Sequence, residues 1–220
     1  MDYPKHKKEN KMATINYAMA DKSFPDASGV DKFKLTMTTE SIYSVSGKQG
    51  ALFTTELIKS YLKTSNITIT DATSNVGSDA IMFALHFDKV NSIELDPINF
   101  SALQNNVRVY GLKNINLIMG DSLNYLDKLH QDVIYIDAPW GGVDYKKHKN
   151  LRLYLGTMEL SDIYLKYKQN ARLFVFKVPV NYDMNYFIYR TRVEKFNVHG
   201  YVNTHNRVVY YNIIIDNNLE

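Results

Sequence analysis

Residues 66–77 read NITITDATSNVG, a run of alternating β-branched residues that leads to the carboxylate of Asp71 and then into a polar turn. β-Branched residues favour the pleated surface of a sheet, so this stretch predicts a strand that ends at Asp71. Residues 78–86 continue as a predicted helix, and residues 90–94 form a second predicted strand that ends at Glu94. This order predicts a parallel pair of strands joined by a crossover helix.

The same alternation continues toward the C-terminus. Asp96 and Pro97 are typical of a helix start, as N-cap and first helical residue, and Gly111 is typical of a helix end. The stretch 132–137 reads DVIYID, which predicts a central strand covered on both faces. Further strands are predicted at 115–119, 172–178, 193–198 and 208–215, the last two as an antiparallel pair, and further helices at 123–129, 158–168 and 184–189.

Residues 1–45 are polar and weakly periodic, and we expect an N-terminal extension that is partly irregular or helical. Apolar residues fall at helical spacing over 52–62. Residues 46–220 are predicted to form one α/β domain, a doubly wound, mostly parallel seven-stranded sheet with an antiparallel edge hairpin. This is the Rossmann-like architecture of class I S-adenosylmethionine methyltransferases.

The composition excludes several kinds of protein. The chain has 220 residues, enough for one such domain and a short extension. It has no cysteine, so disulfides, Cys-ligated zinc and a Cys nucleophile are excluded. The six histidines show no metal-ligand spacing, and we expect no metal. No apolar run could span a membrane and no signal peptide is evident, which predicts an intracellular protein of the nucleus or cytoplasm, of cellular or viral origin.

Three acidic residues follow predicted neighbouring strands, where ligands of doubly wound sheets bind. Asp71 is suited to hold an ammonium group, Glu94 to accept two ribose hydroxyls, and Asp121, with Ser122, to accept hydrogen bonds from an adenine. One strand-end carboxylate is often only a helix cap. Three in this order predict a site for S-adenosylmethionine.

The loop after Asp71 is expected to bring backbone amides close to this cofactor. It contains Thr73, Asn75 and Gly77, whereas such loops usually contain more glycine. Asn75 stands where another glycine is usual. Asparagine tolerates a left-handed backbone better than most residues, so we expect the tight turn to form.

The stretch 137–140 reads DAPW and resembles the D/N/S-P-P-Y/F/W motif of amino-group methyltransferases. An exocyclic amine of a purine is a poor nucleophile, because its lone pair is delocalised into the ring. The oxygen of Asp137 and a backbone carbonyl fixed by Pro139 can hold the amino hydrogens while Trp140 stacks on the base. The simpler alternative is a core tryptophan in a Gly-Gly turn.

Residues 137–145 read DAPWGGVDY and resemble the S-P-P-W-G-G-P-D-Y run of trimethylguanosine synthases. The resemblance extends over roughly residues 40–190. It includes Asp71-Ala72, Val76-Gly77, Asp96-Pro97, Asn105-Asn106, Val109-Tyr110-Gly111 and Gly120-Asp121. The chain therefore resembles a minimal or viral-type member of the RNA cap guanine-N2 methyltransferases.

This resemblance implies roles for particular residues. It implies that Trp140 stacks on a 7-methylguanine, whose cationic ring strengthens the stacking. Asp137, in place of the family's serine, would face the N2 amine. Asn105 or Asn106 would help to orient the base, and Tyr145 would adjoin it.

Capped RNA is the partner that the resemblance implies, and the charge permits it. The formal net charge is +3 and the pI is about 8.8. The N-terminal lysines 5, 7, 8 and 11 could equally be a solvated surface. The second basic cluster lies beside the motif, where it would suit the cap triphosphate, and comprises Lys146, Lys147, Lys149 and Arg152.

Two other functions stay open. Asp137 and Ala138, in place of Ser and Pro, also fit adenine-N6 or ribosomal guanine-N2 methyltransferases. The mRNA adenine-N6 family fits poorly, because its catalytic motif precedes its cofactor motif. A non-catalytic cap-binding or partner protein on a degenerate methyltransferase fold is the third possibility, and the glycine-poor loop favours it.

Overall fold

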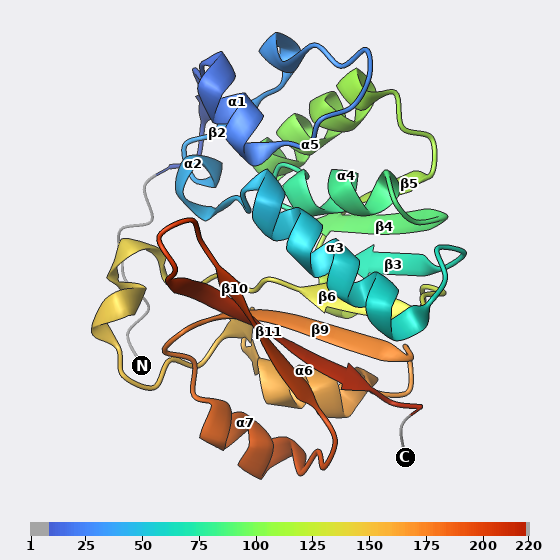
Figure 1. Cartoon of the computed structure of the whole chain (residues 1–220), viewed down its shortest axis with the longest axis vertical. Coiled ribbons are helices and arrows are strands. Elements are labelled where there is room, and N and C mark those ends of the chain that lie inside the picture. Colours follow the sequence, from blue (N-terminus) through green and yellow to red (C-terminus); the bar gives the residue numbers. More distant parts are fainter. Residues whose placement is uncertain (1–8, 219–220) are drawn as a thin grey trace.

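A seven-stranded sheet of order β10-β11-β9-β6-β3-β4-β5 forms the centre of the computed structural model, which describes residues 9–218 (Figure 1). The strands from β9 to β5 are parallel, and β11 pairs antiparallel with both β9 and β10. The predicted sheet and its antiparallel edge hairpin are confirmed. The strands are β3 (Thr68–Asp71), β4 (Lys89–Glu94), β5 (Ile115–Met119), β6 (Val133–Ile136), β9 (Leu173–Pro179), β10 (Asn197–Val202) and β11 (Val208–Asp216).

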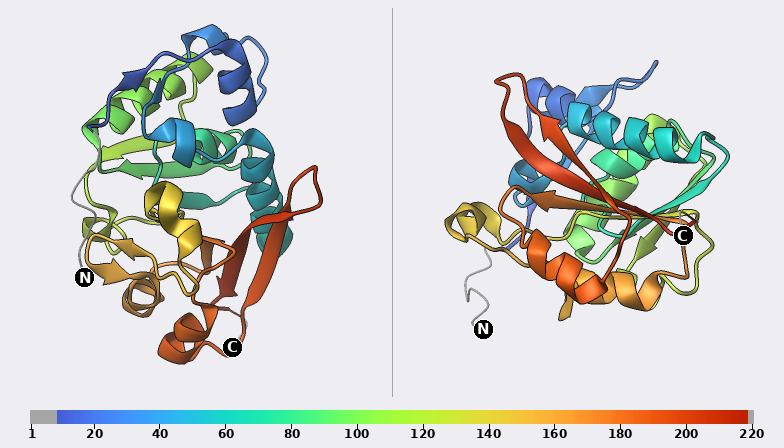
Figure 2. Two further views of the ribbon diagram at one scale, coloured as in Figure 1. Left: turned by 90° about the vertical axis from the view of Figure 1, so that its left-hand side faces the viewer. Right: turned by 60° about the horizontal axis from the view of Figure 1, so that its bottom comes forward.

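Helices cover both faces of the sheet (Figure 2). Val133 and Tyr135 of β6 pack with α3 and α4, whereas Ile134 and Ile136 pack with α6 and α7. Alternate side chains of a strand point to opposite faces, so β6 is buried on both sides, as its apolar sequence predicts. The helices are α3 (Lys48–Leu62), α4 (Ser78–Ala84), α5 (Pro97–Tyr110), α6 (Leu160–Tyr167) and α7 (Met184–Thr191).

Residues 9–45 pack on the outer side of α5 and α4 (blue in Figure 1). Phe24 and Met37 from this segment share one apolar cluster with Leu103 and Val107 of α5. The segment therefore buries its apolar side chains against the helices of the α/β domain, in a cluster of its own. Its elements are β1 (Met12–Ala13), α1 (Tyr17–Ser23), the 3₁₀ turn η1 (Lys32–Lys34), β2 (Met37–Thr38) and α2 (Ser41–Ser44).

Several elements differ from the sequence prediction. The helix predicted at 123–129 is wrong: a 3₁₀ turn, η2 (Ser122–Asn124), and further turns stand there. Asp121 caps η2 by accepting from the Leu123 amide, and the Asn124 and Tyr125 amides bond three residues back, to the carbonyls of Asp121 and Ser122, which is the 3₁₀ pattern. The strand predicted at 193–198 lies four residues later, at β10. Features that were not predicted include the β1–β2 pair, a 3₁₀ segment η3 (Gly142–Lys147), and the small hairpin of β7 (Tyr154–Leu155) and β8 (Met158–Glu159).

Over residues 9–218, we find no helix with the length and apolar character needed to cross a membrane.

Candidate functional site

Acidic residues gather at the carboxyl-end edge of the parallel strands. Asp71 ends β3, Glu94 ends β4, and Asp137 follows β6 directly. β3 and β6 are neighbours in the sheet, and the chain order reverses between them. Ligands of doubly wound sheets bind at such a switch point, which here lies between Asp71 and Asp137.

The loop after β3 forms a tight turn despite its low glycine content. Asn75 and Gly77 both have a left-handed backbone, with φ of 50° and 98°. The Asn75 amide donates to Glu94 at 2.7 Å, and its side chain donates to Ser44 at 2.8 Å. These contacts hold asparagine in a conformation that glycine usually provides.

Asp71 is fully buried, and only one of its two carboxylate oxygens has a hydrogen-bond partner within residues 9–218. Oδ1 accepts the Thr73 amide at 3.1 Å. Oδ2 has no hydrogen-bond partner among the described residues. Burial, and then the charge of Asp79, raises the pKa of Asp71 well above its ordinary value. A buried, unpartnered carboxylate oxygen fits a cationic ligand group, such as an ammonium.

Glu94 is bonded through both oxygens but retains acceptor capacity. It accepts from the amides of Asn75 and Asp96, each at 2.7 Å, and burial raises its pKa. Each carboxylate oxygen has a second lone pair, so two hydroxyls could still be accepted.

Sequence reasoning missed two apolar neighbours at this edge, Leu95 and Met119, which are exposed despite their size. Their position at the ends of β4 and β5 suits a flat aromatic ligand.

Asp121 and Ser122 lie at the end of the neighbouring strand β5. Asp121 is half-buried, and its Oδ1 accepts the Leu123 amide at 3.0 Å, so it is a cap with spare acceptor capacity. Ser122 is buried. Asp71, Glu94 and Asp121 therefore follow the adjacent strands β3, β4 and β5 along one edge of the sheet, in the order expected from the sequence.

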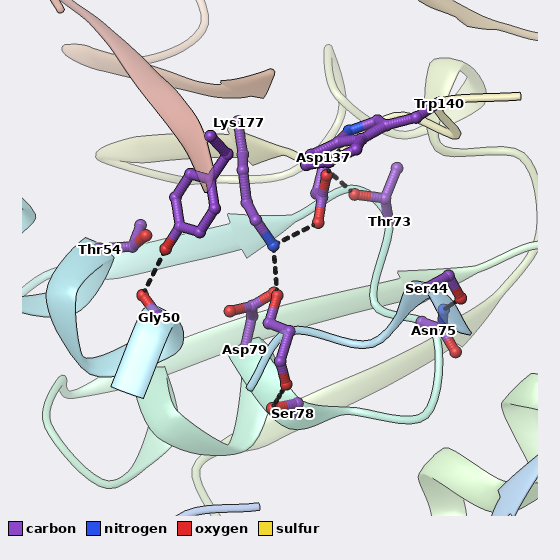
Figure 3. A network of polar contacts seen from close by, with 12 residues as sticks. Ser44, Gly50, Thr54, Thr73, Asn75, Ser78, Asp79, Asp137, Trp140 and Lys177 are labelled. Carbon is purple, nitrogen blue, oxygen red and sulfur yellow. Dashed lines mark hydrogen bonds and ion pairs between the residues drawn. The ribbon is translucent and has the colours of Figure 1, made fainter. Parts of the chain in front are cut away.

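Asp137 stands at the centre of a polar network (Figure 3). Its Oδ1 accepts the indole N–H of Trp140 at 3.1 Å, and its Oδ2 accepts from Lys177 at 2.7 Å. Its backbone amide donates to the hydroxyl of Thr73 at 2.8 Å. Thr73 thereby joins the loop after β3 to the loop after β6, the two segments that carry the predicted cofactor and catalytic residues.

Lys177, on β9, is a third residue that sequence reasoning missed. Its ammonium also donates to Ser46 at 2.5 Å and lies 4.9 Å from the centre of the Tyr210 ring. Burial lowers its pKa, but the charges of Asp137 and Asp79 outweigh this and raise it. A signal was present in the sequence, because β9 reads LFVFKVP and Lys177 interrupts an apolar strand.

Trp140 and Pro139 follow Asp137 at the surface. Pro139 is exposed and Trp140 half-buried, and the indole meets Tyr145 edge-on with centroids 5.2 Å apart. Gly141 and Gly142 have φ of 91° and 73°, a left-handed turn that leads into η3. One edge of the indole is thus fixed by Asp137 and the ring is steadied by Tyr145.

The basic cluster is divided by the fold. Lys146 and Lys147 are exposed on η3, beside Trp140, and Lys147 pairs with Asp144 at 2.6 Å. Arg152 instead lies 3.5 Å from the ring of Tyr186 on α7. Of the N-terminal lysines, residues 5, 7 and 8 lie outside the described residues, and Lys11 pairs with Glu9.

Asn105 and Asn106 require a correction. Asn106 is fully buried on α5, donates to the carbonyls of Thr36 and Val76, and accepts the Thr36 amide at 2.8 Å. Asn105 donates to the Lys34 carbonyl at 2.8 Å. Their amides hold the N-terminal segment on α5, so the predicted contact with the base is wrong.

Comparison with known sequences gives one family. The family model described as RNA cap guanine-N2 methyltransferase matches residues 66–216. The trimethylguanosine synthase of Saccharomyces cerevisiae is 26% identical over 176 residues, covering 75% of this chain and 55% of that protein. An uncharacterized protein of Acanthamoeba polyphaga mimivirus is 36% identical over 126 residues, covering 55% of this chain and 49% of that protein. The chain spans about half the length of these curated relatives.

Solved structures agree on the fold. A putative methyltransferase of Porphyromonas gingivalis superposes with a TM-score of 0.62 at 17% identity, covering 83% of this chain and 43% of that chain. A precorrin-6y C5,15-methyltransferase of Geobacter metallireducens superposes with a TM-score of 0.59 at 13% identity, covering 84% and 95%.

Proposed function

The chain belongs to the RNA cap guanine-N2 methyltransferase family, and from this premise we propose that it methylates the exocyclic N2 amine of 7-methylguanosine in an RNA cap. The observation that carries the proposal is the hydrogen bond between Trp140 and Asp137, at the switch point of the sheet. It sets a stacking surface and a hydrogen-bond acceptor side by side, and recognition of an amino-bearing base requires both.

S-Adenosylmethionine would supply a methyl group on a cationic sulfur, and the C–S bond would break with the electron pair left on sulfur. The residues of the edge fit this cofactor. The free oxygen of Asp71 would hold the ammonium, with Thr73, Asn75 and Gly77 shaping the loop around it. The sites for ribose and adenine would be Glu94 for the hydroxyls and Asp121 with Ser122 for the base, between the apolar side chains of Leu95 and Met119.

The base would lie on Trp140. A 7-methylguanine is cationic, so its stacking on indole gains about 0.5–2 kcal/mol over that of guanine. Asp137 would accept one hydrogen of the N2 amine, which favours a tetrahedral nitrogen with its lone pair free. Pro139 would fix the backbone between these two side chains. The nitrogen then forms the new C–N bond and loses one proton, which leaves to solvent past the partly exposed Asp137.

The cap phosphates would extend over η3. Lys146 and Lys147 are exposed next to Trp140 and Tyr145, and their ammonium groups suit a triphosphate. Arg152 lies further along, against α7, where it would meet the RNA only beyond the cap. The partner we propose is therefore capped RNA, within the nucleus or cytoplasm of a cell.

A single assay tests this proposal. The purified chain is incubated with S-adenosylmethionine and either 7-methylguanosine or guanosine cap analogues, and mass spectrometry locates the added methyl. Methylation at N2 of the 7-methylated cap alone is the expected result. Transfer to unmethylated guanosine or to adenosine would show that the substrate is a nucleic acid other than the 7-methylated cap. Binding of the cofactor without transfer to any of these substrates would show that the protein binds its ligands without catalysing methylation.

A further inference from the structure

The ammonium of Lys177 is buried among three elements distant in sequence. Its side chain is 5% exposed, whereas that of its partner Asp137 is 15% exposed. The lysine comes from β9, and Ser46, which precedes α3, accepts its second hydrogen bond. Ser46 in turn donates to Asp79 of α4 at 2.5 Å. Burying an ammonium without a paired anion is costly, so this arrangement fixes the lysine toward Asp137.

Asp137 is consequently held at both of its oxygens. Lys177 fixes Oδ2 and the Trp140 indole fixes Oδ1, so the carboxylate plane has one orientation. The lysine ammonium and the indole N–H are both donors only, and an ionised carboxylate accepts such bonds more strongly than a protonated carboxyl does. The geometry therefore favours the ionised form of Asp137.

Burial and the nearby carboxylates oppose that ionisation. The titratable groups that face the pair are Asp71 on β3, Asp79 on α4, and the neutral phenols of Tyr135 on β6 and Tyr210 on β11. Burial raises the pKa of Asp137, Lys177 lowers it, and the nearby Asp79 raises it further. Among these groups, Lys177 is the one cation that the described residues place against the carboxylate. Without it, burial and two neighbouring carboxylates would favour the protonated acid.

We propose that Lys177 is a positioning residue that keeps Asp137 ionised and in one orientation, so that this carboxylate can accept a hydrogen of the target amine. The identity of that amine rests on the proposed function, whereas the Lys177–Asp137 pair does not. Ser46 supports the lysine from the segment before α3. Where the related motif has a serine, the aspartate of this chain thus has a built-in counter-ion.

The single tryptophan of the chain makes the pair observable without any substrate. Trp140 donates to Asp137, so protonation of the carboxylate weakens this bond and changes the indole fluorescence. The experiment is a pH titration of Trp140 fluorescence in the cofactor-free wild type, Lys177→Met and Lys177→Arg. We expect the midpoint to move up by about 1–3 pH units in Lys177→Met, and to stay near the wild-type value in Lys177→Arg.

Two controls keep the result interpretable. Asp137→Asn should abolish the transition, which assigns it to this carboxyl. The double variant Lys177→Met/Asp137→Asn removes both charges, so it should fold even if Lys177→Met does not, because no unpaired ion is left buried. If Lys177→Met unfolds and the double variant is folded, the pairing is still supported. An unchanged midpoint in folded Lys177→Met would overturn the proposal.

Methyl transfer provides a separate readout. In Lys177→Met, kcat should fall at least about tenfold at neutral pH and recover as the pH rises past the new midpoint of Asp137, with little change in KM. A fall in kcat that is independent of pH would show a merely structural role. The fluorescence titration stands even if the substrate is not a cap, so failure of the proposed function and failure of this inference are distinguishable.

Discussion

The indole nitrogen of Trp140 donates to Oδ1 of Asp137 across 3.1 Å, so the first and fourth residues of the DAPW motif are bonded to each other. The stacking surface and the acceptor therefore cannot turn independently. A substitution at either residue should disturb both, although to different degrees.

Replacing Trp140 tests recognition of the base. We expect the wild type to bind 7-methylguanosine about 2- to 30-fold more tightly than guanosine, which corresponds to roughly 0.5–2 kcal/mol. Trp140→Ala should abolish this preference, and Trp140→Phe should keep part of it, because a smaller π face remains. Calorimetry with both nucleosides measures the effect, and circular dichroism verifies folding. Equal affinity of the wild type for the two nucleosides would contradict the cap assignment.

Asp71 should make the cofactor-free protein sensitive to pH. Its folded-state pKa is raised, so ionisation opposes folding and stability falls as the pH rises through that pKa. Asp71→Asn should therefore gain stability relative to wild type as the pH increases, by about 1.4 kcal/mol for each pH unit that separates the folded and unfolded pKa values. The same variant should bind S-adenosylmethionine more weakly. Thermal midpoints at pH 5 and pH 8 and calorimetry test the two halves, and a variant with unchanged cofactor affinity would remove Asp71 from the site.

Charge reversal at Lys146 and Lys147 tests their proposed ion pairs with the cap phosphates. The double variant should bind capped RNA more weakly than wild type and bind the bare nucleoside normally. Removing one lysine–phosphate ion pair should reduce the slope of log affinity against log salt by about 0.7. Lys89→Glu/Lys113→Glu is a matched control, since these exposed lysines lie at the opposite edge of the sheet. An equal decrease in affinity for capped RNA and for the nucleoside would show that Lys146 and Lys147 do not bind the cap phosphates.

Asn106 should matter for stability and not for the base. Asn106→Ala leaves two carbonyls and one amide of the Thr36 and Val76 backbone unpaired, and we expect a decrease of about 2–4 kcal/mol in the free energy of unfolding. Asn105→Ala, a less buried position on the same helix, should cost less. Denaturant unfolding measures both. A fully stable Asn106→Ala with weakened base affinity would restore the original interpretation of this residue.

Local pattern was sufficient to predict most of the fold. The strands that end at Asp71 and Glu94 and the helix capped by Asp96 depend on residues within a few positions of one another, so periodicity and capping signals indicate them. The left-handed Asn75 also follows from a local preference. The 3₁₀ turn after Asp121 does not, because the apolar residues of 123–129 are spaced as in a helix and the local pattern does not indicate the turns that form there.

The errors at the site have a common physical cause, which is contact between distant parts of the chain. Asn105 and Asn106 look free in sequence, but the N-terminal segment, about 70 residues earlier, bonds to both side chains, and Asn106 also donates to the Val76 carbonyl. Lys177 looks like a strand residue out of place until Asp137 and Ser46 lie against it. Sequence pattern therefore identifies residues of the catalytic motif, such as Asp137, more readily than the distant residues that position them, such as Lys177.

The hydrogen bond from Lys177 to Ser46 joins residues 131 positions apart, and this separation has a consequence for folding. A contact between residues so far apart in sequence requires a long loop to close. The chain loses the conformational entropy of that loop before the packing of the contact stabilises it. During synthesis, Asp137 emerges well before the lysine that balances its charge. We therefore expect the strand order around β3 and β6 to be established first and the polar network to close late, when β9 adds to the sheet and meets the segment ahead of α3.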